Sequence, residues 1–139
     1  LKGRIAEEQG RHEDAVWAAT KIVGAATEPG DLVRAHALLA NAQDALGRPE
    51  RAEESHKALI QLEPKNAWAR GNYGSFLIGQ DRCEEAIASA KAALALMDYG
   101  VGRSTLKSAY RCRARELRLK NNAAGAAKYE RLAEAVDVR

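Results

Sequence analysis

The feature that most constrains the fold is a short segment that occurs four times along the 139 residues. The copies begin at residues 10, 47, 79 and 121: GRHEDAVWAATKIV, GRPERAEESHKALIQLEP, GQDRCEEAIASAKAALALMD and NNAAGAAKYERLAEA. When the copies are aligned on one alanine, a glycine or alanine stands twelve residues before it in each of them. These pairs are Gly3 and Ala15, Ala40 and Ala52, Gly74 and Ala86, and Ala114 and Ala126. A spacing kept in four copies predicts a repeat architecture, in which each copy is one supersecondary unit.

The small residues predict pairs of closely packed helices. Twelve residues span most of one helix, a tight turn and the first turn of a second helix, and small side chains let the two helices approach. Gly10 and Gly47 can adopt the left-handed conformation that ends a helix, Pro49 suits a helix start, and Asn66 can cap the next helix. Abundant alanine and the lack of β-branched runs also favour helix. We expect helices near 1–9, 12–24, 31–46, 49–62, 66–79, 82–97, 103–119 and 122–136, with a turn-rich connection at 24–31.

The period and pattern resemble the tetratricopeptide repeat, a helix–turn–helix unit of 34 residues with a W-x2-L-G-x2-Y…A-x3-F…P signature. The likeness rests on the 34 residues that separate two of the repeat alanines and on four signature positions: Leu39, Tyr73, Gly74 and Pro64. It departs where the family favours tryptophan (here His36 and Arg70), a large aromatic residue (His56 and Ala90) or a closing proline (Asp98).

The resemblance implies an all-α chain, an α-solenoid of antiparallel helix pairs in a right-handed superhelix with about three and a half repeats. It implies a single domain over 1–139, with repeats near 1–26, 31–64, 66–98 and 103–137. The sequence opens in helical character and without methionine, so we interpret it as a fragment of a longer protein.

Motifs of catalysis and cofactor binding are absent from the sequence. There is no HExxH, no P-loop and no GxGxxG after a strand, and GNYGSFLIG is not a GxSxG elbow. We therefore expect no enzymatic activity, no cofactor and no metal site. His36 and His56 should lie on facing helices of one repeat, where the alternatives are a metal site, a pH-sensitive contact or two packed rings. We favour packed rings because no third metal ligand is evident.

The cysteines and the hydropathy pattern add further expectations. Cys83 and Cys112 stand 29 residues apart, a spacing that matches no metal or redox motif and implies no disulfide framework. We expect both to be small buried helix residues.

No apolar run approaches the ~18 residues of a membrane helix, and no signal peptide is recognised. We therefore expect no membrane partner, and the cytoplasm is the favoured compartment.

Basic residues gather in 103–120, where seven of them accompany a single acid, Glu116, for a local charge of +6 in a chain of net charge +3. The core stripe of this expected helix is Leu106, Tyr110, Ala114 and Leu117. A second stripe, spaced four, four and three residues, is Lys107, Arg111, Arg115 and Arg118. Resemblance to the family places this second stripe on the concave wall of the solenoid. Arg113 should lie near the buried side and extend to water or pair with an acid of the neighbouring second helix.

The same face of the earlier helices completes the predicted groove. It offers Arg34, Ala37, Asn41 and Asp44 in 31–46, and Trp68, Gly71, Asn72, Ser75 and Gly79 in 66–79. The predicted peptide-binding residues are Arg34, Asn41, Trp68, Asn72, Ser75, Lys107, Arg111, Arg115 and Arg118. Gly71 and Gly79 either leave a shallow pocket beside Trp68 or merely weaken the helix, and both alternatives stay open.

Some tetratricopeptide domains hold a C-terminal carboxylate with Asn, Lys and Arg on successive first helices. Asn41 and Asn72 match the two Asn positions of that clamp, but Ser108 and Cys112 stand where its Lys and Arg belong. The mismatch disfavours this clamp and leaves an analogous site for an acidic peptide as the alternative.

We favour a non-catalytic scaffold that binds an acidic or extended segment of another protein in its concave groove. An alternative is a regulatory or targeting module of a larger enzyme. Nucleic-acid binding through 103–120 is disfavoured because the net charge is small and Tyr110 should be buried, where its ring cannot stack on bases. The exposed ends of a cut repeat could also drive self-association.

Overall fold

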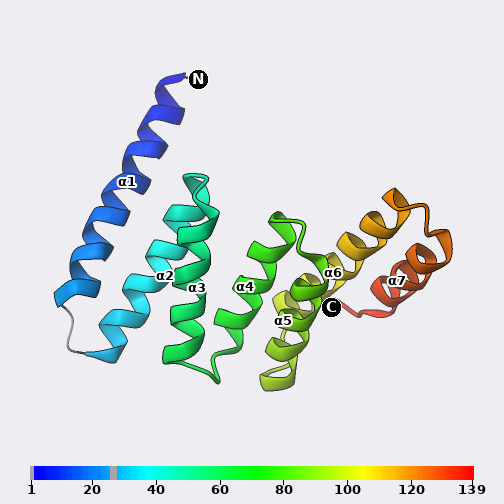
Figure 1. The fold of residues 1–139 in the computed structure, drawn as a ribbon. Coiled ribbons are helices and arrows are strands. Elements are labelled where there is room, and N and C mark those ends of the chain that lie inside the picture. The colour runs from blue at the N-terminus through cyan, green and yellow to red at the C-terminus, as the bar shows by residue number, and fades with distance from the viewer. Residues whose placement is uncertain (1, 26–27) are drawn as a thin grey trace. The chain divides into compact units, whose positions relative to one another are not determined.

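The chain folds into helices joined by short connections (Figure 1). The computed structural model describes residues 2–25 and 28–139; Leu1 and part of the expected turn at 24–31 lie outside the described residues. Within these ranges there is no strand, and the helices are α1 (Lys2–Ala25), α2 (Pro29–Ala45), α3 (Pro49–Leu62), α4 (Ala67–Gly79), α5 (Cys83–Leu96), α6 (Gly100–Leu119) and α7 (Ala123–Ala135). The all-α expectation is confirmed. None of these helices is both long and apolar enough to cross a membrane.

Helices α3, α4 and α7 begin where the sequence carries helix-start signals. Pro49 is the first residue of α3, where its fixed φ fits and its missing N–H costs no hydrogen bond. Asn66 precedes α4, and its side chain accepts a hydrogen bond from the Ala69 N–H at 3.1 Å, which confirms the predicted cap. Asn122 caps α7 in the same way, through the Gly125 N–H at 2.9 Å.

The first repeat departs from the prediction, because α1 is a single helix of 24 residues where the sequence predicts two, at 1–9 and 12–24. Gly10 lies inside α1 and does not end a helix. A glycine in a helix interior costs only about 1 kcal/mol relative to alanine, whereas stopping and restarting a helix requires a second, unfavourable nucleus. No proline follows Gly10 to force a stop, so the helix continues.

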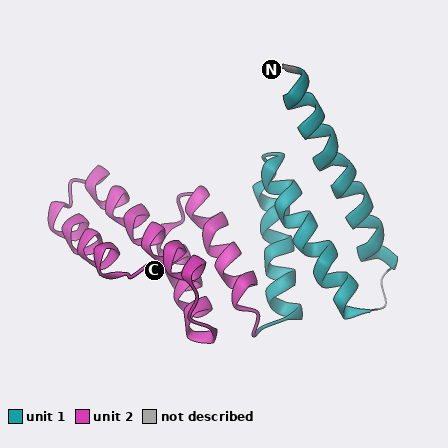
Figure 2. Cartoon of the chain, turned by 180° about the vertical axis from the view of Figure 1, so that it is seen from behind, with its two compact units in different colours: residues 1–64 teal, residues 65–139 magenta. Residues whose placement is uncertain are grey.

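Contacts between helices divide the chain into two compact units, residues 1–64 and 65–139 (Figure 2). In the first unit α1 packs on α2, and α2 packs on α3. The centre of the α1–α2 contact is formed by Ala19, Ala35 and Leu39, which are buried, with Val16 and Val23 packed against them. Three of these five side chains are alanine or valine from α1, so the contact buries little apolar area per residue.

In the second unit α4 packs on both α5 and α6, α5 packs on α6, and α6 packs on α7. Tyr110, Ala114 and Leu117 are buried in α6, which confirms three of the four predicted core positions. Leu106, the fourth, is half-buried. The core stripe of α6 was therefore predicted correctly from its helical spacing.

One turn geometry joins the two helices in three pairs: α2 with α3, α4 with α5, and α6 with α7. The central residue of the turn has a positive φ, 71° at Gly47, 57° at Asp81 and 60° at Asn121. The N–H that follows it donates to the carbonyl five residues earlier, at 2.9, 3.0 and 2.8 Å respectively. These are Schellman caps, which satisfy the last carbonyls of the preceding helix. Each central residue stands five positions before the repeat alanine, as Gly10 does in the first copy.

The small residues that define the repeat are buried in the same three pairs: Ala40 and Ala52, Gly74 and Ala86, and Ala114 and Ala126. A Cβ placed on Gly74 would lie 3.4 Å from Thr105 Cγ2 and 3.5 Å from the Ala86 carbonyl oxygen. These are ordinary contact distances, so an alanine would fit, whereas a larger side chain would push α4 away from α5 and α6. Close packing therefore explains a small residue at this position. In the first copy Gly3 is exposed and Ala15 only half-buried, as the unbroken α1 leads one to expect.

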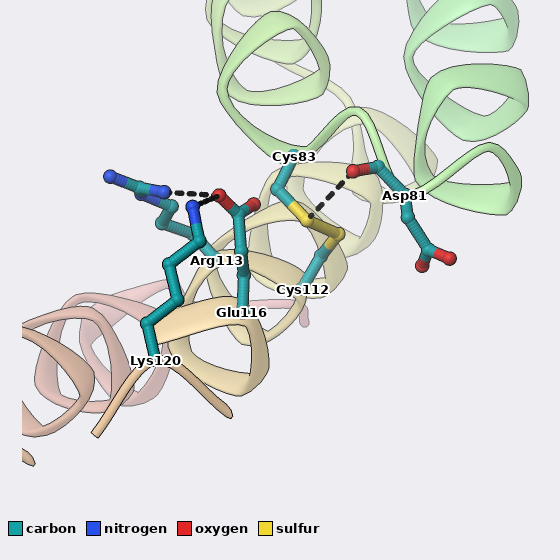
Figure 3. The surroundings of a disulfide bond; sticks show 6 residues. All are labelled: Asp81, Cys83, Cys112, Arg113, Glu116 and Lys120. Carbon is teal, nitrogen blue, oxygen red and sulfur yellow. Dashed lines mark hydrogen bonds and ion pairs between the residues drawn. A yellow bond between two sulfur atoms is a disulfide. The ribbon is translucent and has the colours of Figure 1, made fainter. Parts of the chain in front are cut away.

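Cys83 and Cys112 form a disulfide between α5 and α6 (Figure 3). Both residues are buried, at 3% and 2% exposure, so the predicted burial is right but the prediction of two unlinked thiols is wrong. The Cα atoms lie 5.5 Å apart because α5 packs on α6, and that distance suits a disulfide. The separation of 29 residues along the sequence does not predict that the two cysteines lie close together.

Candidate functional site

The predicted binding residues fall on three helices. Arg34 and Asn41 are exposed on α2 of the first unit, and Arg34 forms an ion pair with Asp31 at 3.0 Å. The second unit carries Trp68, Asn72 and Ser75 on α4, and Lys107, Arg111, Arg115 and Arg118 on α6. Because α4 packs directly on α6, the residues of the second unit lie on neighbouring helices. A groove that joins all nine residues stays a prediction.

A shallow hollow of about 290 Å³ lies between α4 and α6. Its lining residues are Ser75, Ile78, Val101, Ser104, Thr105 and Ser108. Ser75 alone among them is a predicted site residue. Ser104 and Ser108 could have been found from helical spacing, because positions 104, 108, 111 and 115 follow one another at four, three and four residues on one face of α6.

Ion pairs within the chain neutralise much of the positive charge of α6. Arg103 pairs with Asp98 at 2.5 Å, and Lys120 pairs with Glu116 at 3.3 Å. Arg118, which the sequence assigns to the groove, pairs with Glu130 of α7. The local charge of +6 is therefore not the charge that α6 presents to a partner.

Arg111 and Arg115 differ from their neighbours on α6. Both are exposed, and in the described part of the chain neither forms an ion pair. Lys107 is half-buried, and it contributes to a lowered pKa of Asp137, which is caused mainly by hydrogen bonds from Arg139. The predicted stripe of four cations thus narrows to Arg111 and Arg115, one helical turn apart.

Arg113 connects α6 to α5. Its guanidinium lies 3.0 Å from Glu84 of α5 and 2.5 Å from Glu116 of its own helix, and its side chain is only 17% exposed. Both parts of the prediction for Arg113 are confirmed, its position near the buried side and its pairing with an acid of the neighbouring helix. The disulfide adjoins these ion pairs, since the bonded cysteines immediately precede Glu84 and Arg113 in the chain. Figure 3 shows the pair of Arg113 and Glu116 beside the disulfide. A covalent bond and an ion pair together hold α6 against α5.

The space beside Trp68 is filled by Tyr99. The two ring centroids lie 4.6 Å apart, and the Tyr99 hydroxyl donates to the Ala67 carbonyl at 3.2 Å. A Cβ on Gly71 would collide with that hydroxyl, so Gly71 makes room for Tyr99 and leaves no pocket for a ligand. The alternative of an open pocket at Gly71 is therefore wrong, whereas the position of a Cβ on Gly79 has open space around it. Trp68 itself is 49% exposed.

The two histidines belong to the contact between α2 and α3. His56 is buried on α3, and His36 is half-buried on α2. Burial lowers the pKa of both rings, and for His56 the nearby Asp44 and Glu53 oppose that shift. Burial thus favours the neutral form of both rings. Among the residues that the structure describes, no group of three His, Cys, Asp or Glu side chains converges in a way that could hold a metal ion.

Comparison with known proteins yields no match, either to a protein-family model or to a curated protein. The function of the chain must therefore be inferred from its residues and their geometry.

Proposed function

We propose that the chain is a tetratricopeptide-like repeat module without chemistry of its own, which binds an acidic segment of another protein at the exposed surface of α4 and α6. The proposal of a repeat fold is supported by the three identical caps at Gly47, Asp81 and Asn121. It is also supported by the α4–α6 contact, because first helices of successive repeats pack on one another in a solenoid. Together with α1, the three pairs suit a right-handed solenoid of about three and a half repeats.

The observation that carries the proposed function is the isolation of Arg111 and Arg115. The fold pairs other cations of α6 internally, but it leaves these two exposed and one turn apart, where like charges repel by a few tenths of a kcal/mol. An acidic partner would remove that repulsion. Arginine suits carboxylates because its planar guanidinium can donate two parallel hydrogen bonds.

The proposal can be tested by binding of a fluorescent ten-residue peptide of alternating glutamate and glycine. The variant Arg111→Glu with Arg115→Glu should bind at least tenfold more weakly than the native chain. A control with the same net charge is Arg51→Glu with Arg131→Glu, because both residues are exposed on other helices and form no ion pair in the described chain. The control should bind within threefold of the native chain, and circular dichroism should show equal helicity in all three proteins.

Two results would contradict this proposal. If the variant and the control lose the same affinity for the peptide, net charge alone governs binding. A single-stranded oligonucleotide that binds more tightly than the peptide, with a steep salt dependence, would favour a nucleic-acid partner. The geometry argues against that partner, because Tyr110 is 7% exposed and cannot stack on a base.

The disulfide bears on the compartment in which the module acts. Disulfides persist in oxidising environments and are rare in the cytosol, where thiols are kept reduced. The buried bond between Cys83 and Cys112 therefore supports an oxidising compartment, and we propose it in place of the cytoplasm that the sequence favours.

A further inference from the structure

The hollow between α4 and α6 and the two isolated arginines form one surface. Ser104 and Ser108 line the hollow, and Arg111 and Arg115 continue the same face of α6 beyond it. α4 ends at Gly79, which leaves open space around the position of its missing Cβ. The surface therefore has a hollowed part between two helices and a basic part on α6.

Part of the lining of the hollow is apolar. Ile78 and Val101 contribute aliphatic side chains, and the Thr105 hydroxyl already donates to the Val101 carbonyl at 2.9 Å. The hydroxyl hydrogen of Thr105 is thus already used within α6. Val101 is 56% exposed, so a bound aliphatic side chain would gain by covering it.

The rest of the lining of the hollow is polar. Ser75, Ser104 and Ser108 are exposed around it, and their hydroxyls can donate to or accept from a peptide backbone. At about 290 Å³ the hollow is slightly smaller than the ~300–1,000 Å³ of pockets that enclose small-molecule ligands. Its size suits one side chain of a bound peptide better than a cofactor.

We propose that this hollow seats one aliphatic side chain of the acidic segment whose carboxylates meet Arg111 and Arg115; this inference rests on the proposed function. The helical rise of 1.5 Å per residue puts Arg111 about 4.5 Å and Arg115 about 10.5 Å beyond Ser108 along α6. An extended chain advances about 3.3 Å per residue. The recognised segment therefore carries its acids about one and three residues from the aliphatic anchor.

The test uses ten-residue fluorescent Gly/Ser peptides that carry one leucine and two glutamates. In two probes the glutamates stand one and three residues after, or before, the leucine. One comparison peptide replaces leucine by glycine, a second replaces both glutamates by glutamine, and a third moves the glutamates to seven and eight residues away. At least one probe should bind the intact chain tenfold more tightly than all three comparison peptides.

A matched pair of variants locates the anchor. Ser104→Phe fills the hollow and should reduce binding of the better probe tenfold, while leaving binding of the leucine-free peptide within twofold. Ala88→Phe places the same side chain at an exposed position of α5. This control should change neither the binding of the better probe nor that of the leucine-free peptide. Circular dichroism checks that both variants keep their helices.

The outcomes separate this inference from the function on which it rests. If the leucine-free peptide binds as tightly as both probes and depends on Arg111 and Arg115, the acidic-peptide function stands and the anchoring role of the hollow is refuted. If no glutamate peptide binds, both proposals fail. If the glutamine peptide binds as tightly as the probes, the hollow is an apolar site unrelated to the arginines, which also overturns the inference.

Discussion

Cys83, the first residue of α5, is bonded through its sulfur to Cys112 in the middle of α6, and their Cα atoms lie 5.5 Å apart. The bond closes a stretch that contains all of α5, the connection to α6 and the first half of α6. Alanines dominate the core of this unit, and alanine contributes little apolar area, so a covalent link between the two helices should matter more here than in a core rich in leucine.

Loss of the disulfide should strongly destabilise the fold. A link across 29 residues restricts the unfolded chain and is expected to contribute about 3.5 kcal/mol to the free energy of unfolding. We expect Cys83→Ser with Cys112→Ser to lower the midpoint of guanidinium unfolding by an amount that corresponds to this loss of free energy. Reductant should lower the midpoint of the native chain as well, but leave the double variant unchanged.

Alkylation checks the bond itself. The unfolded native chain should take up no maleimide before reduction and two maleimide groups after it, as measured by mass spectrometry. Two labels without reductant, in protein taken directly from an oxidising compartment, would show that the thiols are free.

Much of the helical framework could be predicted from the sequence, because the determining interactions are local. The predicted helix 49–62 coincides with α3, since Gly47 and Pro49 fix the turn with backbone conformations that few other residues adopt. The turns at Asp81 and Asn121 were less evident, because Asp and Asn enter the left-handed region only when the surrounding packing favours it. Gly10 shows the converse. A glycine can adopt the left-handed conformation, but no surrounding contact favours it at Gly10, and the residue stays helical.

The candidate site could be predicted only in part, because its character depends on side chains from other helices. The positions of Arg111 and Arg115 follow from helical spacing, but Arg118 is neutralised by Glu130 of α7, which the spacing within α6 cannot show. The filling of the space at Gly71 by Tyr99 is likewise a contact between α4 and the connection before α6. The disulfide also depends on a contact between two helices, so helical spacing alone could not predict it.

Two glycine substitutions should have opposite effects. Gly10→Ala meets nothing within 4 Å and sits inside α1, so it should increase helicity and stabilise α1 by up to about 1 kcal/mol. Gly47→Ala also has open space, but its φ of +71° is unfavourable for a side chain and should cost about 1 kcal/mol. Circular dichroism and urea unfolding measure both. A loss of helicity in Gly10→Ala would mean that α1 is interrupted there, as the sequence predicts.

The ion pair between Arg113 and Glu84 should contribute modestly to the free energy of unfolding, and replacing Arg113 should cost more than replacing Glu84. Arg113 is 17% exposed and also pairs with Glu116, so Arg113→Leu should cost about 1–2 kcal/mol. Glu84 is 69% exposed, and Glu84→Gln should cost less than about 0.5 kcal/mol because water replaces the lost partner. A double-mutant cycle in urea should give a coupling below about 1 kcal/mol that weakens in 0.5 M salt. A strong, salt-independent coupling would contradict this estimate.

The buried histidines should make the first unit sensitive to mild acid. The pKa of His36 and His56 is lowered by burial below the 6.5 of the unfolded chain, so the unfolded state binds more protons once the pH falls below about 6.5. Stability should therefore be constant above pH 7.5 and decrease as the pH falls from 6.5 towards 5, the reverse of a histidine with a raised pKa. His56→Gln should flatten this decrease most, because His56 is the more deeply buried ring, although Asp44 and Glu53 partly offset its shift. His12→Gln keeps both of these rings and serves as the control. Urea midpoints at pH 8.0, 6.5 and 5.0 check the sign, and a native chain more stable at pH 5.0 than at 8.0 would show that the acids outweigh burial.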